Sequence, residues 1–373
     1  MSTSRASSAE HIPHGEGPVL VLERQGREGS AVMAVEALRA AWETLGAATP
    51  MQSYSWAWSC AKAFENDGLR IVTAGTPTPR AIAAFTAASR GSAALIPLGA
   101  ELWEPTDFAY VDASAAEALS EELARLKTSV LIRDMFADSM MVEALRRAGG
   151  RRLVTQPVGG HPWLELDDTW LEPEARLNAG RRSDLRRAQR NAAKVGAVQC
   201  EIIRPALAEL TPLLDEAFAA ESAGWKGNQG TGLATDPRVG GFYRHFAQAA
   251  CELGTLRIGI LRIGGQAAAM QFAVEQDGCF WLFKMGFDES FARFSPGTLL
   301  MVESLRSARQ RGCNRYELMG TTAAWNQVWA PRLHEAVSVH LHAPTVRGWV
   351  NVITEHTKGA IKSHLRARAE KSK

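Results

Sequence analysis

Two periodicities alternate along the first half of the chain. Apolar residues recur about every 3.6 positions in some segments, as in amphipathic helices, and about every second position in others, as in strands. The segments with the helical period lie at residues 32–46, 55–66, 114–127 and 139–150. The predicted strands lie at 19–23, 69–75, 81–89, 129–135 and 161–166. This alternation predicts an α/β or α+β half built on one sheet.

The second half repeats the alternation after a polar connection. Residues 177–196 are polar nearly all round, which predicts an exposed bridging helix that touches the body through Leu185 and Ala188 and stops at Gly196. Beyond it, helices are predicted at 207–224, 238–254 and 298–312, and strands at 255–265, 266–278, 279–288, 313–320 and 336–343.

These segments divide the chain into five parts. A disordered lead at 1–16 precedes an N-terminal domain at 17–170, and a basic connecting helix at 171–199 leads to a C-terminal domain at 200–345. A basic helix or tail at 346–373 ends the chain. With 373 residues, 46% of them hydrophobic, the chain is neither disordered nor fibrous and has the length of two ordinary domains.

The formal net charge of +2 hides a segregation of charge. Residues 176–194 carry six Arg, one Lys and one Asp, and residues 346–373 carry seven Lys or Arg and two Glu. These two basic segments hold +6 and +5, which leaves −9 on the other 326 residues. A general nucleic-acid-binding surface is therefore not expected.

Three interpretations of the basic segments stay open. Solvated surface helices are the default, and peripheral attachment to anionic lipids is the second, especially for the tail. The third is an anionic ligand such as a nucleotide, a cyclic dinucleotide or tRNA, because Arg both stacks on bases and pairs with phosphate.

The cysteines and the N-terminus indicate a cytoplasmic protein, with peripheral association at the inner membrane as an alternative. The five cysteines are widely spaced and form no CxxC motif, which suits reduced thiols. The first residues lack the apolar core of a signal peptide, and no 18-residue apolar run occurs.

A helix start in the second half is the first candidate binding element. The sequence Ser-Pro-Gly at 295–297 stands between a predicted strand and a predicted helix. Free N–H groups and the positive end of the helix dipole at such a start suit a phosphate or pyrophosphate. Ser-Pro-Gly also opens many helices that bind nothing, so this motif alone decides little.

The surrounding motifs give it a context. They are ESAGWKG at 221–227, FKMGFDE at 283–289, SPGTLL at 295–300, and ELMG at 317–320 with Trp329 beyond it. Together they resemble the CelD/BioF2-like branch of the Gcn5-related N-acetyltransferase (GNAT) superfamily, which is also similar to the FemABX peptidyltransferases. The likeness is clearest over 200–345, and PLGAELWEPTDFAY at 97–110 also fits this family.

The resemblance implies an α/β, tandem GNAT-like fold of the FemABX type, with mixed sheets flanked by helices and an acyl-CoA site in the second half only. The central strands of such a fold splay, and residues 283–287 would offer backbone groups to the pantetheine arm. The implied donor-binding residues are Lys284, Met285, Gly286, Arg293, Ser295, Pro296, Gly297, Thr298, Leu299 and Leu300. Acetyl-CoA is the expected acyl donor, and no metal is expected. The chain departs from typical GNAT enzymes in lacking the full glycine-rich pyrophosphate loop.

Acyl transfer to an amine also requires a group that takes the amine proton. Glu221, Asp288 and Glu317 match acidic positions of the family, and Glu221 or Asp288 is the preferred base or amine anchor. The alternative for Glu221 and for Asp288 is a structural position, on a solvated helix face or as a cap at the end of a strand. Lys226 and Trp225 are candidates for binding a substrate anion and a sugar ring, and Trp329 is a further substrate-binding candidate.

Two further sequence features bear on the choice of site residues. The family often has Lys before the later Trp, whereas Asn326 stands within WNQVW here and supplies no cation. His340 and His342 share one strand face but lack an evident third ligand, which favours an incidental pair over a metal site.

The resemblance therefore predicts an acyl-CoA-dependent N-acetyltransferase that acts on a small-molecule or saccharide amine, such as an amino sugar or related precursor in exopolysaccharide or cell-envelope polysaccharide synthesis. Transfer would be direct, without an acyl-enzyme. One rival is a FemABX-like aminoacyltransferase that takes its donor from aminoacyl-tRNA. The other is a catalytically degenerate GNAT fold that serves as a ligand sensor or scaffold.

Overall fold

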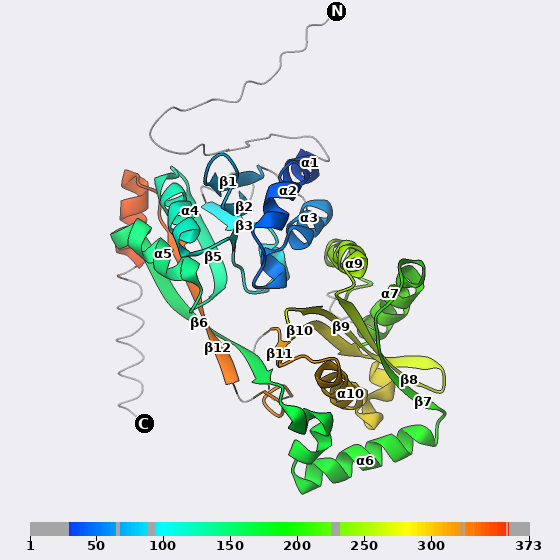
Figure 1. Ribbon diagram of the computed structural model, residues 1–373. Coiled ribbons are helices and arrows are strands. Elements are labelled where there is room, and N and C mark those ends of the chain that lie inside the picture. Colours follow the sequence, from blue (N-terminus) through cyan, green and yellow to red (C-terminus); the bar gives the residue numbers. More distant parts are fainter. Residues whose placement is uncertain are drawn as a thin grey trace, which may run out of the picture.

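A computed structural model describes residues 30–64, 68–88, 94–224, 232–320, 322–323, 325–330, 332–355 and 357. Its described strands form one mixed sheet in the order β1-β2-β3-β5-β12-β6-β11-β10-β9-β8-β7, with β4 paired to β2 (Figure 1). Only the β3–β5 and β10–β11 pairs are parallel. The predicted lead at 1–16 and strand at 19–23 lie outside the described residues.

The N-terminal half builds one end of this sheet. Its helices are α1 (Ser30–Glu36), α2 (Arg39–Thr44), α3 (Tyr54–Ala63), α4 (Ala113–Arg125) and α5 (Met140–Gly149). Its strands are β1 (Arg70–Ala74), β2 (Ala81–Ala87), β3 (Ala94–Pro97), β4 (Ala109–Tyr110), β5 (Ser129–Phe136) and β6 (Leu153–Glu165). The helix predicted at 32–46 is two short helices, because a tight bond from the N–H of Leu38 to the carbonyl of Val35 ends the first.

The rest of the chain builds the other end. It contains α6 (Ala179–Ala193), α7 (Leu207–Ser222), α9 (Pro237–Glu252) and α10 (Pro296–Gln310). Its strands are β7 (Val198–Ile203), β8 (Leu256–Ile263), β9 (Gln266–Gln276), β10 (Cys279–Phe287), β11 (Arg315–Leu318) and β12 (Arg332–Leu341). The predicted bridging helix is confirmed as α6, which buries Leu185, Ala188 and Ala192. Strands β3, β4 and β7 were not predicted.

β12 ties the two ends of the sheet together. It lies between β5 and β6 of the N-terminal half, although it comes last in the chain (Figure 1). β6 in turn continues past β12 to pair with β11 through Trp163, Leu164 and Glu165. The sheet is therefore continuous across both halves, and β6 separates β12 from the other strands predicted for residues 200–345.

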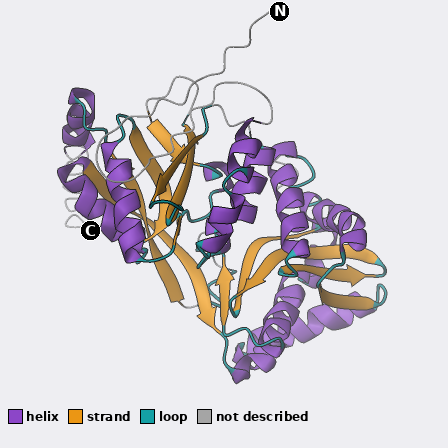
Figure 2. Cartoon of the chain, turned by 45° about the horizontal axis from the view of Figure 1, so that its top comes forward, coloured by secondary structure: helices purple, strands orange, loops and turns teal. Residues whose placement is uncertain are grey.

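Helices cover both faces of the sheet (Figure 2). α4 and α5 pack on one face of the N-terminal half, while α1 to α3 pack on the other and meet α7 and α9 in a shared core. Trp56 stands in the middle of this core, with its ring 4.8 Å from Phe242 and 5.3 Å from Phe283 of β10. α6 and α10 cover the opposite face of the C-terminal half. None of the described helices is both long and apolar enough to span a bilayer.

Candidate active site

β10 and β11 part where the candidate site begins. The two strands are paired from Cys279 to Leu282, and the N–H of Met319 still donates to the carbonyl of Leu282. β11 ends at Leu318, whereas β10 continues to Phe287 alongside β9, after a bulge between Leu282 and Lys284. Within the described chain, residues 283–287 therefore have a strand partner on one side only, and the predicted splay is present.

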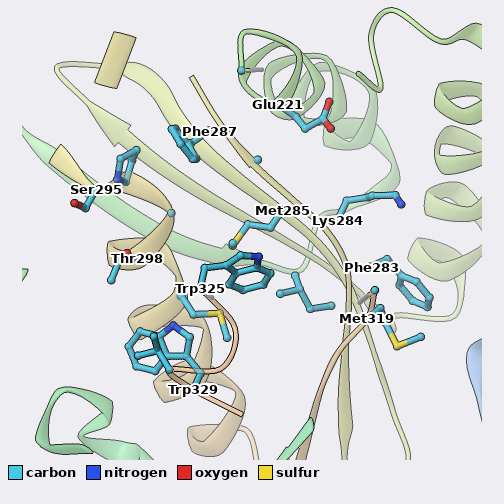
Figure 3. A pocket seen from close by; sticks show the side chains of 18 of the residues that line it. Glu221, Phe283, Lys284, Met285, Phe287, Ser295, Thr298, Met319, Trp325 and Trp329 are labelled. Carbon is cyan, nitrogen blue, oxygen red and sulfur yellow. The ribbon is translucent and has the colours of Figure 1, made fainter. Parts of the chain in front are cut away.

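A cavity of about 840 Å³ occupies this opening (Figure 3). Its size falls in the range of ligand pockets. Its wall comes from β10, the start of α10, the end of α7, the exposed helix α6 and a loop of the N-terminal half. The lining residues are Leu102, Trp103, Glu104, Leu177, Arg181, Asp184, Leu185, Glu221, Gly224, Leu282, Phe283, Lys284, Met285, Gly286, Phe287, Ala292, Ser295, Pro296, Gly297, Thr298, Met301, Met319, Gly320, Trp325, Val328 and Trp329.

The first turn of α10 forms one end of the cavity. Ser295 takes a left-handed conformation, with φ of 49°, and Pro296 follows as the first helical residue. The turn offers fewer free N–H groups than the four that a helix start ordinarily leaves without an intrahelical partner. Pro296 has no N–H, Ser295 donates to Ala292, and Thr298 and Leu299 both donate to the carbonyl of Ser295. Of residues 295–299, Gly297 alone has an N–H without an acceptor among the described residues.

α6 supplies a positive charge to the cavity wall. Arg181, Asp184 and Leu185 line the cavity, and Arg181 is exposed. The side chain of Asn178 caps the helix by accepting from the N–H of Arg181 at 2.9 Å. The basic helix predicted as a connection is therefore also part of the cavity wall. An anionic ligand was one interpretation of the charge on 176–194, but the sequence did not identify Arg181 as the residue that lines the cavity.

An ion pair between the two halves forms the other end. Nζ of Lys284 lies 3.4 Å from Oε1 of Glu104, and both side chains are largely buried. Lys284 points away from Ser295 and Thr298 (Figure 3), and its ammonium also lies 5.3 Å from the centre of the Tyr243 ring. The Lys284 side chain, predicted as donor-binding, thus lies far from the helix start, while its backbone belongs to the open edge of β10.

Glu104 is the acidic residue that the sequence analysis missed. Burial raises its pKa, and the neighbouring Lys284 ammonium opposes that shift. Its Oε2 is buried without a hydrogen-bond partner in the described part of the chain. A carboxyl with a raised pKa that lines a cavity has the properties of a general base. The signal in the sequence was a carboxylate between Trp103 and Pro105 in the segment 97–110, which resembles the family and also holds Glu101 and Asp107.

Glu221 reaches the cavity from α7, as predicted. It is 2% exposed, and its Oε2 accepts the N–H of Leu233 at 2.8 Å and lies 3.3 Å from Oγ of Ser222. One of its oxygens is therefore used to hold the chain that follows α7. Its carboxylate stands above β10 near Lys284 (Figure 3).

The other two acidic candidates do not line the cavity. Asp288 caps the short 3-10 helix Glu289–Phe294 by accepting the N–H of Ser290 at 2.8 Å. Glu317 is 1% exposed on β11, with Oε1 at 3.1 Å from Nε2 of His334. The structure places Asp288 in the cap role named as its alternative.

The predicted donor-binding residues divide into two groups. Seven of them line the cavity: Lys284, Met285, Gly286, Ser295, Pro296, Gly297 and Thr298. The other three do not. Leu299 and Leu300 pack into the core, and Arg293 is exposed with its guanidinium 4.6 Å from the Phe294 ring.

Tryptophans border the cavity on two sides. Trp103 is 70% exposed and Trp325 is 42% exposed, while Trp329 is 5% exposed and packs into the core as it lines the wall. Asn326 between them is buried and accepts the N–H of Ala323 at 2.8 Å, so it holds the turn. The predicted substrate residues Trp225 and Lys226 lie outside the described residues.

Part of the chain matches a known domain family. Residues 179–327 match the model of the Acetyltransferase (GNAT) domain, from α6 to the turn that holds Trp325. That range contains every cavity residue except those of the 102–104 loop, Leu177, Val328 and Trp329. No curated protein matches the chain significantly.

Solved structures are similar over most of the chain. The C-terminal domain of a putative lysylphosphatidylglycerol synthetase from Agrobacterium fabrum is 13% identical, covers 87% of this chain and 96% of its own, and has a TM-score of 0.55. FemX is 12% identical over 82% of this chain and 95% of its own, with a TM-score of 0.54. L-PGS from Bacillus licheniformis is 11% identical over 86% and 96%, with a TM-score of 0.51. At these identities the likeness concerns the fold, and the expected mixed α/β fold, GNAT-like and similar to FemX, is confirmed.

Proposed function

We propose that this chain is an N-acyltransferase that takes an acyl group from acyl-CoA and passes it directly to an amine. The observation that carries the proposal is the edge of β10 beyond Leu282, where, among the described strands, β11 has parted from it and β9 alone remains paired. This edge opens into a cavity with a helix start at one end and a buried carboxylate–ammonium pair at the other. Such a cavity offers backbone groups to an extended donor and a protonatable group to its partner.

The donor would lie along β10, with its phosphates toward α10. The N–H of Gly297 and the dipole of α10 favour an anion there, and Arg181 adds a positive charge to the same cavity. A pantetheine arm would pair with the backbone of 283–287 as a strand does. That path would be lined by the apolar, polarizable side chains of Met285, Met301 and Met319.

The chemistry needs a base at the thioester end. The amine nitrogen forms a bond to the acyl carbon, the carbon–sulfur bond breaks, and the thiolate leaves. Glu104 would take the amine proton, because burial raises its pKa and its free oxygen is available within the described site. Glu221 is the alternative base, and Lys284 would hold Glu104 in its ionised form.

The acceptor we propose is an amino sugar or related precursor in exopolysaccharide or cell-envelope polysaccharide synthesis, as for the CelD-like proteins that the sequence resembles. Trp103 and Trp325 support it, because both line the cavity and keep ring surface exposed. Aromatic faces are suited to pack against the apolar face of a sugar ring. Acetyl-CoA is the proposed donor.

A FemABX-like reaction that uses aminoacyl-tRNA is the second candidate. It is favoured by one observation, that the arginine-rich helix α6 lines the cavity instead of lying apart from it. Exposed arginines beside a cavity could bind the phosphates of an RNA end. The basic tail at 346–373 would add a membrane or nucleotide contact in either case.

The deciding experiment incubates the full chain with acetyl-CoA and deacetylated amino-sugar oligomers, and measures CoA release. Release that depends on the sugar and needs no tRNA supports the proposal. Release only with aminoacyl-tRNA in place of acetyl-CoA supports the second candidate. Binding of neither donor would contradict both and would leave a ligand sensor or scaffold.

A Gly297→Asp variant tests the donor site itself. A carboxylate at this position would repel phosphates from the first turn of α10. Gly297→Ala is the matched control, since a Cβ there would meet only Cδ1 of Phe287, at 3.7 Å. Equal acetyl-CoA affinity in the two variants would refute the assignment of this site.

A further inference from the structure

Two histidines and a glutamate converge at the end of β12, far along the sheet from the cavity. Nδ1 of His340 and Nε2 of His342 both lie 2.9 Å from Oε2 of Glu355. The three ligand atoms all lie within 4.8 Å of one another, and the two imidazole rings are 3.8 Å apart. None of the three residues lines the cavity.

The fold supplies the third group that the sequence did not reveal. Residues two apart in extended chain project to the same face, which places both imidazoles together. The chain then turns at 342–345, and residues 346–355 form a helix that returns over the strand end and brings Glu355 to the histidines. A Cβ on Gly348 would stand 2.0 Å from the carbonyl oxygen of Ala343, so only glycine allows this close return.

The cluster has a buried side and a side that is exposed to solvent. His342 has 1% of its side chain exposed, whereas His340 and Glu355 keep 24% and 27%. Arg152 donates to the carbonyl of His342 at 2.9 Å, and Nε2 of Gln156 lies 3.5 Å from Oε1 of Glu355. Such outer contacts orient metal ligands in known sites, and the exposed side gives an ion access.

The donor set and its spacing fit a transition metal ion. Two imidazoles and one carboxylate form three-ligand zinc sites that keep a fourth position for water. Ligand atoms about 2.0 Å from a tetrahedral zinc ion stand about 3.3 Å apart, so the observed 2.9 Å separations need only a small outward shift. Imidazole nitrogens together with one carboxylate oxygen are donors that also suit a divalent transition metal ion better than an anion.

We propose that His340, His342 and Glu355 bind a divalent transition metal ion of the zinc type. The ion would join β12 to the helix at 346–355 and hold that helix on the sheet. Because the cluster stands apart from the cavity, the ion would act on stability and on the position of the helix. It would not take part in acyl transfer.

The test uses the full chain after treatment with a chelator. Titration with ZnCl2 in a calorimeter should give one ion per chain, with a dissociation constant on the order of micromolar or below. Saturating Zn²⁺ should raise the midpoint of thermal unfolding by about 3 °C. No saturable binding below about 100 μM, a value far weaker than ordinary zinc sites, would overturn the proposal.

Variants separate this cluster from other ligands on the chain. Glu355→Gln keeps every histidine and cysteine and should weaken Zn²⁺ binding at least about tenfold. His340→Asn, at a half-buried position, should do the same. His245→Asn, a half-buried histidine on α9, is the control and should bind as the parent does. Equal affinity in Glu355→Gln and the parent would overturn the assignment, as would anomalous scattering that places the bound zinc elsewhere.

Discussion

Gly286 of β10 lies directly against the side chain of Glu221. A Cβ built on Gly286 would stand 2.4 Å from Cγ and 2.9 Å from Cβ of that glutamate. The absence of a side chain at 286 therefore lets α7 bring a buried carboxylate down onto the open strand of the cavity. Glu221 belongs to the motif ESAGWKG and Gly286 to FKMGFDE, so two residues 65 positions apart in the chain form one contact.

Gly286→Ala should disrupt this contact. The added methyl group has to push Glu221 or α7 away from β10, and overpacking of this kind costs typically about 1–3 kcal/mol. Chemical denaturation would show the loss of stability, and acyl transfer should fall with it. Gly297→Ala at the other end of the same wall has room for its Cβ and should lose no stability, because Ala is more favourable than Gly in a helix by about 1 kcal/mol. Equal losses in the two variants would contradict the steric argument.

Glu104→Gln should lower kcat about 100-fold or more, because general-base catalysis contributes at least that factor. The amide has the shape of the carboxylate but does not take a proton, so donor binding should stay near the parent value. The measurement is steady-state kinetics together with acetyl-CoA affinity. Glu121→Gln, at an exposed position on α4, is the control and should change neither kcat nor acetyl-CoA affinity. If Glu221→Gln alone abolishes turnover while Glu104→Gln does not, Glu221 is the base.

Lys284→Met should move the pH dependence of the reaction upward. Burial raises the pKa of Glu104, and the Lys284 ammonium opposes this rise. Without the ammonium the pKa goes higher, so the carboxylate needed as base appears only at higher pH. In a plot of kcat/KM against pH, the rising acidic limb should therefore shift to higher pH in the variant. An unchanged or lowered limb would show that Glu104 does not govern it.

Arg181→Glu should weaken binding of a donor that carries phosphates, since Arg181 lines the same cavity as the first turn of α10. A drop of about tenfold or more in acetyl-CoA affinity is expected at low ionic strength, with a smaller drop at high salt. Arg190→Glu makes the same charge change on an exposed position of α6 that does not line the cavity. Equal effects from both variants would indicate a general field of α6 instead of a local contact.

Asp107→Asn should change how stability depends on pH. Burial raises the pKa of Asp107 to about 6, although Phe108, Ser139 and Tyr110 donate hydrogen bonds to it. A carboxyl whose folded pKa is raised stabilises the fold at low pH and loses that contribution as pH rises through about 6. Relative to Asp107→Asn, the parent should therefore lose on the order of 2 kcal/mol between pH 4 and pH 7. Parallel stability curves would contradict the shift.

The sequence by itself determined most of the elements, although not β3, β4 and β7, and it marked two of the elements that line the cavity. Alternating periods located α3, α4 and α5 within a few residues, because a helix or strand leaves its period in neighbouring positions. The motifs at 283–289 and 295–300 marked the strand and the helix start that meet at the cavity. These features depend on short-range order, which a single sequence contains.

The tertiary structure alone decided which distant residues meet. Glu104 and Lys284 are 180 positions apart and form one pair, and β12 inserts between β5 and β6 although the other strands near it in sequence lie elsewhere. Glu355 reaches His340 and His342 only because a helix folds back over the strand. The tertiary structure also decided the protonation behaviour of Glu104 and Asp107, because burial raises the pKa of both carboxyl groups. Burial and long-range pairing depend on how the whole chain folds, and the local periodicity of the sequence does not specify which distant segments meet.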